Sequence, residues 1–203
     1  MATEHGCTDD DFRMENRVGT DLLVMKIGHG FDHLDVDGDG LLTEHDHVLC
    51  GRRVAAALGH AEGSDGERRI VDAYLGIWRD LHLPHLPEGA TAISRKDFIT
   101  STAGLAEDPE AAAATVGALA RVFLEIADTD RDGRVSPAEF LVFQRGHFPG
   151  LTEAEADEAF THLDTDGDGS LSAEEFVRAL TEFWSSTAPD APGNWWMGRP
   201  GRP

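Results

Sequence analysis

Three short acidic clusters in the chain repeat the pattern Asp-x-Asp-x-Asp-Gly, beginning at Asp35, Asp128 and Asp164. Carboxylates at every second position of a short segment can face one centre and attract a hard divalent cation. Calcium takes six to eight oxygen ligands at about 2.3–2.6 Å, so a loop must wrap around the ion to deliver them. The Gly at the sixth place permits a backbone turn that costs other residues energy. The clusters therefore predict calcium binding.

Each cluster continues as a twelve-residue loop with an apolar eighth place, a hydroxyl at the ninth and an acid at the twelfth. This is the spacing of the EF-hand calcium loop, in which the seventh residue binds through its backbone carbonyl and the ninth usually through water. We expect three bound calcium ions. The predicted ligands are Asp35, Asp37, Asp39, Leu41, Thr43 and Asp46 in the first loop (35–46); Asp128, Asp130, Asp132, Arg134, Ser136 and Glu139 in the third loop (128–139); and Asp164, Asp166, Asp168, Ser170, Ser172 and Glu175 in the fourth loop (164–175).

The first loop departs from the pattern because it ends on Asp46, whereas the third and fourth loops end on Glu. Asp is one methylene shorter, so its carboxylate reaches the ion less easily with both oxygens. About six ligands would then remain, the octahedral number that the smaller Mg²⁺ demands. The hypothesis is that this loop is the least calcium-selective and holds Mg²⁺ in a resting cell. In the competing interpretation, Gly28 and Gly30 let the preceding helix shift inward and restore two-oxygen binding.

A second loop without calcium is expected between the first and third, because EF-hands bury their apolar faces in pairs. Residues 86–97 fit the later positions of the pattern, but Leu86 and Ala90 replace two ligands and Thr91 replaces the turn Gly. This hand should fold but stay silent. Its Ile93 should pair with Leu42 in a short antiparallel contact between loops. Val135 should pair with Leu171 in the same way.

Apolar residues at helical spacing flank each calcium loop, which predicts that each loop joins two helices. Phe31, Phe123 and Phe160 belong to the entering segments. Ser136 and Thr152 are residue types that cap the first turn of a helix. For the silent hand, residues 64–83 supply the entering helix. The sequence therefore predicts an all-α fold of four EF-hands in two pairs.

With the loops placed, the chain resembles the sarcoplasmic calcium-binding protein group and its bacterial calerythrin branch. The resemblance rests on four hands with a silent second one, long linkers in the first pair, and Asp ending the first loop. It implies a compact body in which both pairs enclose one core, and a cytosolic calcium buffer or transporter. We divide the chain into an N-terminal pair (1–105), a C-terminal pair (106–185) and a tail (186–203). The adjacent Trp195 and Trp196 favour a tail that packs on the body, rather than a tail that is frayed.

The alternative function is a calcium sensor that binds a target protein or a small ligand on calcium loading. Sensors open a Met-rich groove, and the four methionines here form no stripe on a helix pair. Related photoproteins enclose a luciferin among Tyr, His and Trp, and Tyr74 is the one tyrosine. The single tyrosine disfavours a photoprotein. It does not exclude a cavity that binds another small ligand.

Other chemistries have weaker support in the sequence. His29 and His33 are one helical turn apart, and His45 and His47 flank Asp46. These histidines, together with Cys50, could form a transition-metal site. Spacing alone fixes ligand geometry poorly, and surface histidines on an acidic protein are the simpler interpretation. No esterase, zinc-protease or phosphate-loop motif occurs, so we expect no enzyme.

Composition agrees with a cation-binding role. The formal net charge is −21, from 38 acidic and 17 basic residues. Nucleic acids and anionic membranes attract Lys and Arg clusters, so neither is an expected partner. The polar, acidic start lacks a secretory signal, and no stretch is long and apolar enough to span a membrane. We expect a cytoplasmic monomer whose partners are calcium ions.

Overall fold

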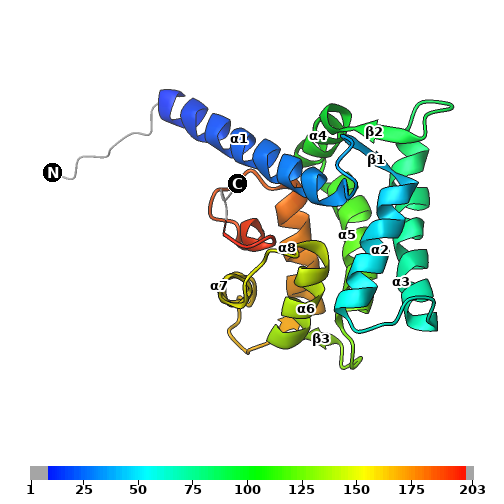
Figure 1. The fold of residues 1–203 in the computed structure, drawn as a ribbon. Helices are drawn as coiled ribbons and strands as arrows, with labels where there is room; N and C mark the ends of the chain where they lie inside the picture. The colour runs from blue at the N-terminus through cyan, green and yellow to red at the C-terminus, as the bar shows by residue number, and fades with distance from the viewer. Residues whose placement is uncertain (1–8, 200–203) are drawn as a thin grey trace.

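The computed structural model describes residues 9–199, with side chains from Gly19 onward (Figure 1). Residues 1–8, on which the expectation of a missing secretory signal depends, and residues 200–203 of the tail lie outside it. The described chain is mostly helical, which confirms the all-α prediction. The helices are α1 (Asp9–Leu34), α2 (Glu44–Ala57), α3 (Asp65–Ile77), α4 (Arg95–Ala103), α5 (Pro109–Ala127), α6 (Pro137–His147), α7 (Glu153–Leu163) and α8 (Ala173–Ser185). The strands are β1 (Leu41–Thr43), β2 (Ala92–Ser94), β3 (Arg134–Val135) and β4 (Leu171–Ser172).

Consecutive helices form four helix–loop–helix units whose loops are joined in pairs by short strands. Strand β1 pairs antiparallel with β2, with Leu42 opposite Ile93. Strand β3 pairs with β4, with Val135 opposite Leu171. All four side chains are buried, so the apolar eighth place of each loop anchors the loop to the core. Both predicted pairings are confirmed.

The predicted helix starts have the expected caps. Ser136 and Thr152 each form a capping box, with the side chain accepting from the backbone N–H three residues on. Thr43 and Ser172 do the same at the starts of α2 and α8. The ninth residue of each calcium loop is thus also the N-cap of the exiting helix, so loop and helix are fixed to each other.

The entering helix of the second hand changes form before it ends. The α-helix expected over residues 64–83 begins after its N-cap Ser64 but ends at Ile77. A π-helical turn, Trp78–His82, and a 3₁₀ turn, Leu83–His85, follow. Pro84 lacks an N–H and so cannot extend the π-helical pattern. π-Turns occur often at functional sites, and this one carries His82 to a central cavity described below.

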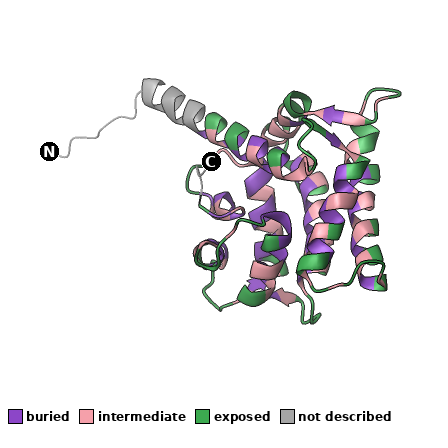
Figure 2. Cartoon of the chain, viewed as in Figure 1, coloured by how far each residue is buried: buried purple, intermediate pink, exposed green. Residues whose placement is uncertain are grey.

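One hydrophobic core runs through both pairs, which confirms the expectation of a common core (Figure 2). It joins Phe31 of α1 and Tyr74 of α3 to Phe143 of α6. Helices α2 and α6 approach closely because Gly146 has no side chain: a Cβ there would lie 2.8 Å from the Val54 Cα. The boundaries of the division into two pairs and a tail stay a prediction.

The tail docks on the body up to residue 199, as the sequence favoured. Trp196 is 3% exposed and packs edge-on against Phe176, with ring centroids 5.0 Å apart. Trp195 stacks on His162 of α7 at 3.8 Å, and Gln144 Nε2 donates to the Trp196 carbonyl at 2.6 Å. In Figure 1 this segment lies beside α7 and α8. Within the described residues, no helix is long and apolar enough to cross a bilayer.

Candidate metal sites

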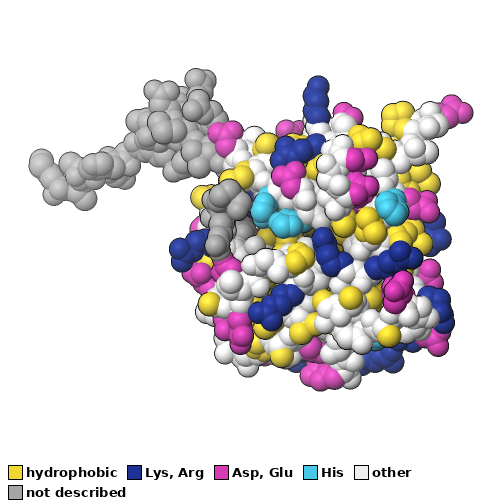
Figure 3. Space-filling view, viewed as in Figure 1, with side chains coloured by type: hydrophobic (Ala, Val, Ile, Leu, Met, Phe, Trp, Pro, Cys, Tyr) yellow, Lys and Arg dark blue, Asp and Glu magenta, His cyan; other side chains and the backbone are white. Residues whose placement is uncertain are grey.

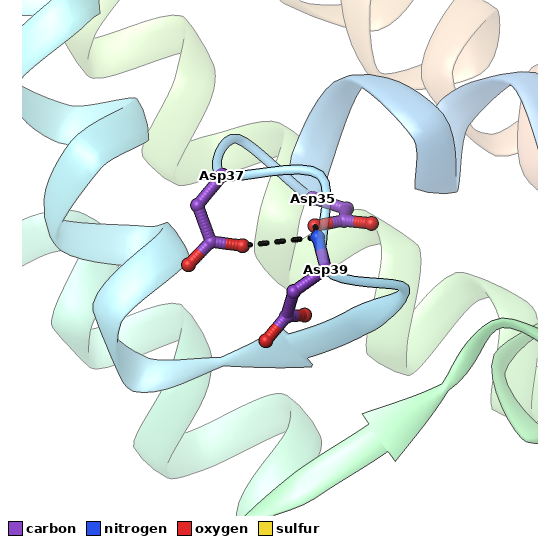
Figure 4. A group of neighbouring side chains, drawn as sticks. All are labelled: Asp35, Asp37 and Asp39. Carbon is purple, nitrogen blue, oxygen red and sulfur yellow. Dashed lines mark hydrogen bonds between the residues drawn. The ribbon is translucent and has the colours of Figure 1, made fainter.

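The first loop gathers three of its predicted ligands. Carboxylate oxygens of Asp35, Asp37 and Asp39 lie within 4.8 Å of one another (Figure 4). Backbone N–H groups hold Asp35 in place: Gly38 donates to its Oδ1 at 2.9 Å and Gly40 to its Oδ2 at 2.9 Å. Both glycines have φ near +80°, at 73° and 85°, a region that other residues rarely adopt. The backbone thus directs the carboxylates to one centre, and their oxygens fit the donor set that Ca²⁺ requires.

The third and fourth loops repeat this geometry with one difference. The fourth loop groups Asp164, Asp166 and Asp168, whereas the third groups Asp128, Asp130 and Glu139. Three of the predicted carboxylate ligands lie outside these groups of oxygens: Asp46, Asp132 and Glu175.

The acids at the twelfth place are held by the loops they close. Asp46 is 1% exposed; its Oδ1 accepts from Val36 N at 3.0 Å and its Oδ2 from Thr43 N at 2.9 Å and Thr43 Oγ1 at 2.6 Å. Glu139 and Glu175 make the same contacts with Thr129 and Ser136, and with Thr165 and Ser172. The hydroxyls predicted at the ninth place, on Thr43, Ser136 and Ser172, donate to these acids.

These hydrogen bonds keep the two glutamates ionised. Burial raises the pKa of Glu139, but donors on Ser136 and Thr129 outweigh it and lower the pKa to about 2. The pKa of Glu175 is lowered to about 2 by the same balance, with Ser172 and Thr165 as donors. Both acids therefore carry charge at neutral pH, as a calcium ligand must.

At the seventh place, Leu41, Arg134 and Ser170 lie at or beside the strands that pair the loops. Sequence reasoning assigned Arg134 only a backbone carbonyl. Its side chain instead forms an ion pair with Asp168 and donates to Ser170 Oγ, both in the fourth loop. The pairing of β3 with β4 brings the two loops together, and no spacing within either loop signals the contact.

Residues 86–97 gather no group of three potential metal-ligating side chains; such groups in the described part of the chain lie in the other three loops. The left-handed turn falls at Gly89, with φ 81°, rather than at Thr91. None of these groups includes a histidine or cysteine. His29 and His33 instead contact each other, with their Nε2 atoms 3.2 Å apart, and Cys50 is buried.

A cavity of about 720 Å³ lies in the centre of the body. Residues of α1 to α6, α8 and the tail line it, most of them apolar or aromatic. Burial lowers the pKa of His33 and His147 to about 4, and that of His82 to about 3. These three lining histidines are therefore neutral at pH 7. The sequence analysis did not exclude a cavity for a small ligand, but it did not identify the residues that line it.

One face of the molecule has a mixed charge pattern despite the large negative net charge. On the face seen in Figure 3, acidic side chains are interspersed with Lys and Arg. Asp37, Asp39, Asp166 and Asp168 are exposed members of the metal-site groups, so a cation can reach them from solvent.

Comparisons with known proteins agree with this geometry. Residues 118–183 match the family described as an EF-hand domain pair. Calerythrin of Saccharopolyspora erythraea is 29% identical over 172 residues, 84% of this chain and 94% of calerythrin. A sarcoplasmic calcium-binding protein of Perinereis vancaurica tetradentata is 31% identical over 124 residues, 61% of this chain and 68% of that protein. The solved calcium-loaded apo coelenterazine-binding protein of Renilla muelleri has a similar fold, with a TM-score of 0.70 and 23% identity, covering 95% of this chain and 99% of that one.

Proposed function

The chain belongs to the EF-hand calcium-binding proteins, together with the sarcoplasmic calcium-binding proteins and calerythrin, and on this premise we propose that it is a calcium buffer that holds three Ca²⁺ ions. It is a calcium-binding protein, not an enzyme. The ions bind in loops 35–46, 128–139 and 164–175 through the eighteen ligands named above. The first loop accepts Mg²⁺ when calcium is low.

The common core is the observation that supports a buffer over a sensor of protein targets. A sensor frees an apolar groove for its target when calcium binds. Here the apolar faces of the two pairs cover each other, and Trp196 of the tail packs among them. The exposed large hydrophobic side chains in the described residues are Val24, Met25, Leu41 and Leu83. A target helix therefore finds little exposed apolar surface to bind unless the two EF-hand pairs separate.

Calorimetric titration tests the proposal. We expect three ions per chain, with the third and fourth loops binding at or below about 10⁻⁷ M without magnesium and more weakly with it. Replacing Asp35, Asp128 or Asp164 by Asn should each remove one ion. The matched control is Asp97→Asn in the silent loop, which should leave the count at three. Two or four ions in the unchanged protein would contradict the proposal.

A second candidate function, calcium-linked carriage of a small ligand, is favoured by the central cavity. Its volume lies within the range of about 300–1,000 Å³ that is usual for small-molecule sites. The structural neighbour from Renilla is a coelenterazine-binding protein. Native mass spectrometry of protein purified from its own source, with and without calcium, tests this candidate. A bound small molecule supports it, and an adduct-free mass in both states contradicts it.

The cellular setting completes the proposal. A net charge of −21 opposes self-association and binding to nucleic acid or anionic membranes, which supports a monomer. The proposed setting of this buffer is the cytoplasm. Sedimentation at low and high calcium should give a mass near 22.0 kDa in both states. A calcium-dependent dimer would contradict the monomer.

A further inference from the structure

Two histidines on one face of α1 place their ring nitrogens side by side. His29 and His33 are four residues apart, a spacing that makes them neighbours on a helix surface. Their Nε2 atoms are 3.2 Å apart, and the rings meet edge-on with centroids 4.6 Å apart. Both residues are partly exposed, so an ion can reach them from solvent. In the described part of the chain, neither Nε2 has another hydrogen-bond partner.

The distance between the two nitrogens is one that a single transition-metal ion can bridge. Zinc–imidazole bonds are about 2.0–2.1 Å long. Two such bonds to nitrogens 3.2 Å apart would meet at an angle of about 103°, between the roughly 90° of an octahedral site and the roughly 109° of a tetrahedral one. Without an ion, a proton on one Nε2 must lie between the two atoms. A metal ion can take the place of that proton, because the soft χ2 torsion of histidine lets small ring rotations aim both lone pairs at it.

Neighbouring residues fix the pair without occupying its nitrogens. The His33 ring packs edge-on against Phe148, with centroids 4.5 Å apart. The His33 carbonyl accepts from Arg53 Nη2 at 3.2 Å, which ties the end of α1 to α2. The positive charge of Arg53 disfavours a cation at His33 and the negative charge of Asp32 favours one, with Arg53 the stronger of the two. We therefore expect moderate affinity.

We propose that His29 and His33 bind a divalent transition-metal ion such as Zn²⁺ or Cu²⁺ through their Nε2 atoms, with water completing its coordination. Imidazole nitrogen suits Zn²⁺, Cu²⁺ and Ni²⁺, whereas Ca²⁺ and Mg²⁺ take oxygen ligands, so the pair selects against the ions that suit the acidic loops. Cys50 takes no part, because it is buried with its Sγ 3.9 Å from the Leu34 carbonyl oxygen. The inference does not rest on the buffer proposal.

Calorimetric titration of the calcium-saturated protein with Zn²⁺ tests the site, because Ca²⁺ keeps the acidic loops occupied. His29→Gln and His33→Gln should each lower the zinc affinity at least about 10-fold, since loss of even an outer-shell partner costs a metal site that much. The chain has 10 histidines, so His85→Gln, at an exposed site, is the matched control and should leave the zinc affinity unchanged. Calcium binding should be the same in the parent and the three variants, which checks that the variants fold.

Cu²⁺ reports the ligands directly. Electron spin-echo spectra of the calcium-saturated protein with equimolar Cu²⁺ should detect two imidazoles in the parent and one in His29→Gln or His33→Gln. Absence of zinc binding in the parent, or equal zinc affinity in the parent and both single variants, would overturn the proposal. A loss of zinc affinity in His85→Gln as large as theirs, or a parent copper spectrum with fewer than two imidazoles, would do the same.

Discussion

Arg134 places a guanidinium from the third loop on Asp168, a predicted ligand of the fourth. A calcium ion in the fourth loop must compete with this contact. Exposed ion pairs are weak because solvent screens them. Arg134→Ala should therefore tighten calcium binding at the fourth loop by no more than a few-fold, measured in an Asp35→Asn/Asp128→Asn background where only that loop binds. Arg131→Asn is the control, since it removes the same charge from the third loop and Asn tolerates the positive φ there. Equal effects of the two variants would assign the gain to net charge.

Asp46 lies outside the group formed by Asp35, Asp37 and Asp39, and is held by Val36 and Thr43. Asp46→Glu adds the methylene that lets both oxygens reach the ion. We expect selectivity for Ca²⁺ over Mg²⁺ at the first loop to rise roughly 10-fold, about 1.4 kcal/mol of added contact. Paired calorimetric titrations with the two ions measure it.

Glu139→Asp in the third loop is the reciprocal control and should lower selectivity there. If Asp46→Glu leaves selectivity unchanged, a shift of α1 becomes the better account. The structure opposes a large shift, because Gly30 lies against Trp184, where a Cβ would come within 2.4 Å of the indole ring.

Helix α1 holds the tail through one buried amine. Lys26 is 4% exposed and donates to Glu182 O at 3.1 Å, Ser186 O at 3.0 Å and Asn194 Oδ1 at 2.6 Å. Burial lowers its pKa to about 8, so it stays charged at pH 7. Lys26→Met leaves these acceptors without a donor and should cost about 3 kcal/mol, or roughly 6–12 °C in Tm.

The chain offers a matched control for that prediction, because its other lysine, Lys96, is exposed. Lys96→Met should change stability by no more than about 0.5 kcal/mol. A released tail should also red-shift the fluorescence of Trp195 and Trp196. Unchanged melting and fluorescence in Lys26→Met would show that the tail docks without the amine.

Features governed by local chemistry were predictable from the sequence. The caps at Ser136 and Thr152 depend on neighbouring residues, and the pairing of Leu42 with Ile93 follows from the fixed eighth place of the loop. The contact of Arg134 with Asp168, the π-turn before His82 and the cavity depend on packing between distant segments. Sequence spacing carries no record of such contacts, which is why the acidic groups of the three loops were predictable and the cavity lining was not.

For the molecule as a whole, buried histidines make stability depend on pH. The folded pKa values of His33, His82 and His147 lie below the unfolded value near 6.5, so unfolding takes up protons as the pH falls. Their contribution is complete above pH 6.5 and is lost as the pH falls toward 4. For His147, which is fully buried, the loss is about 3 kcal/mol. Glu139 and Glu175, with pKa values about 2, stay ionised through this window.

Urea unfolding between pH 7.5 and 4.5 checks this, using a calcium-free variant with Asp35, Asp128 and Asp164 changed to Asn. His147→Gln should flatten the fall in the free energy of unfolding. His45→Gln, at an exposed site, should not. A flat profile in the parent variant would contradict the prediction.

Calcium removal should loosen the whole body. Each loop gathers carboxylates that repel one another without an ion. At a free calcium concentration 1,000-fold above the dissociation constant, one tight site adds about 4 kcal/mol, or roughly 8–16 °C in Tm for a protein of this size. Calorimetric scans with calcium and with a chelator measure the change. The triple Asn variant is the control and should melt at the same temperature in both. A chelated parent that melts within a degree or two of the loaded form would contradict the prediction.

The burial of Trp196 has a consequence for how the chain folds during synthesis. Its ring packs on Phe140, Phe143 and Phe176, and α2 of the first half packs on α6 of the second. An N-terminal pair emerging alone from the ribosome would expose the apolar face that the second half later covers. The core closes only when residue 196 has left the exit tunnel. We expect the first half to complete its packing only after the second half has been synthesised, and the nascent chain needs protection from aggregation until then.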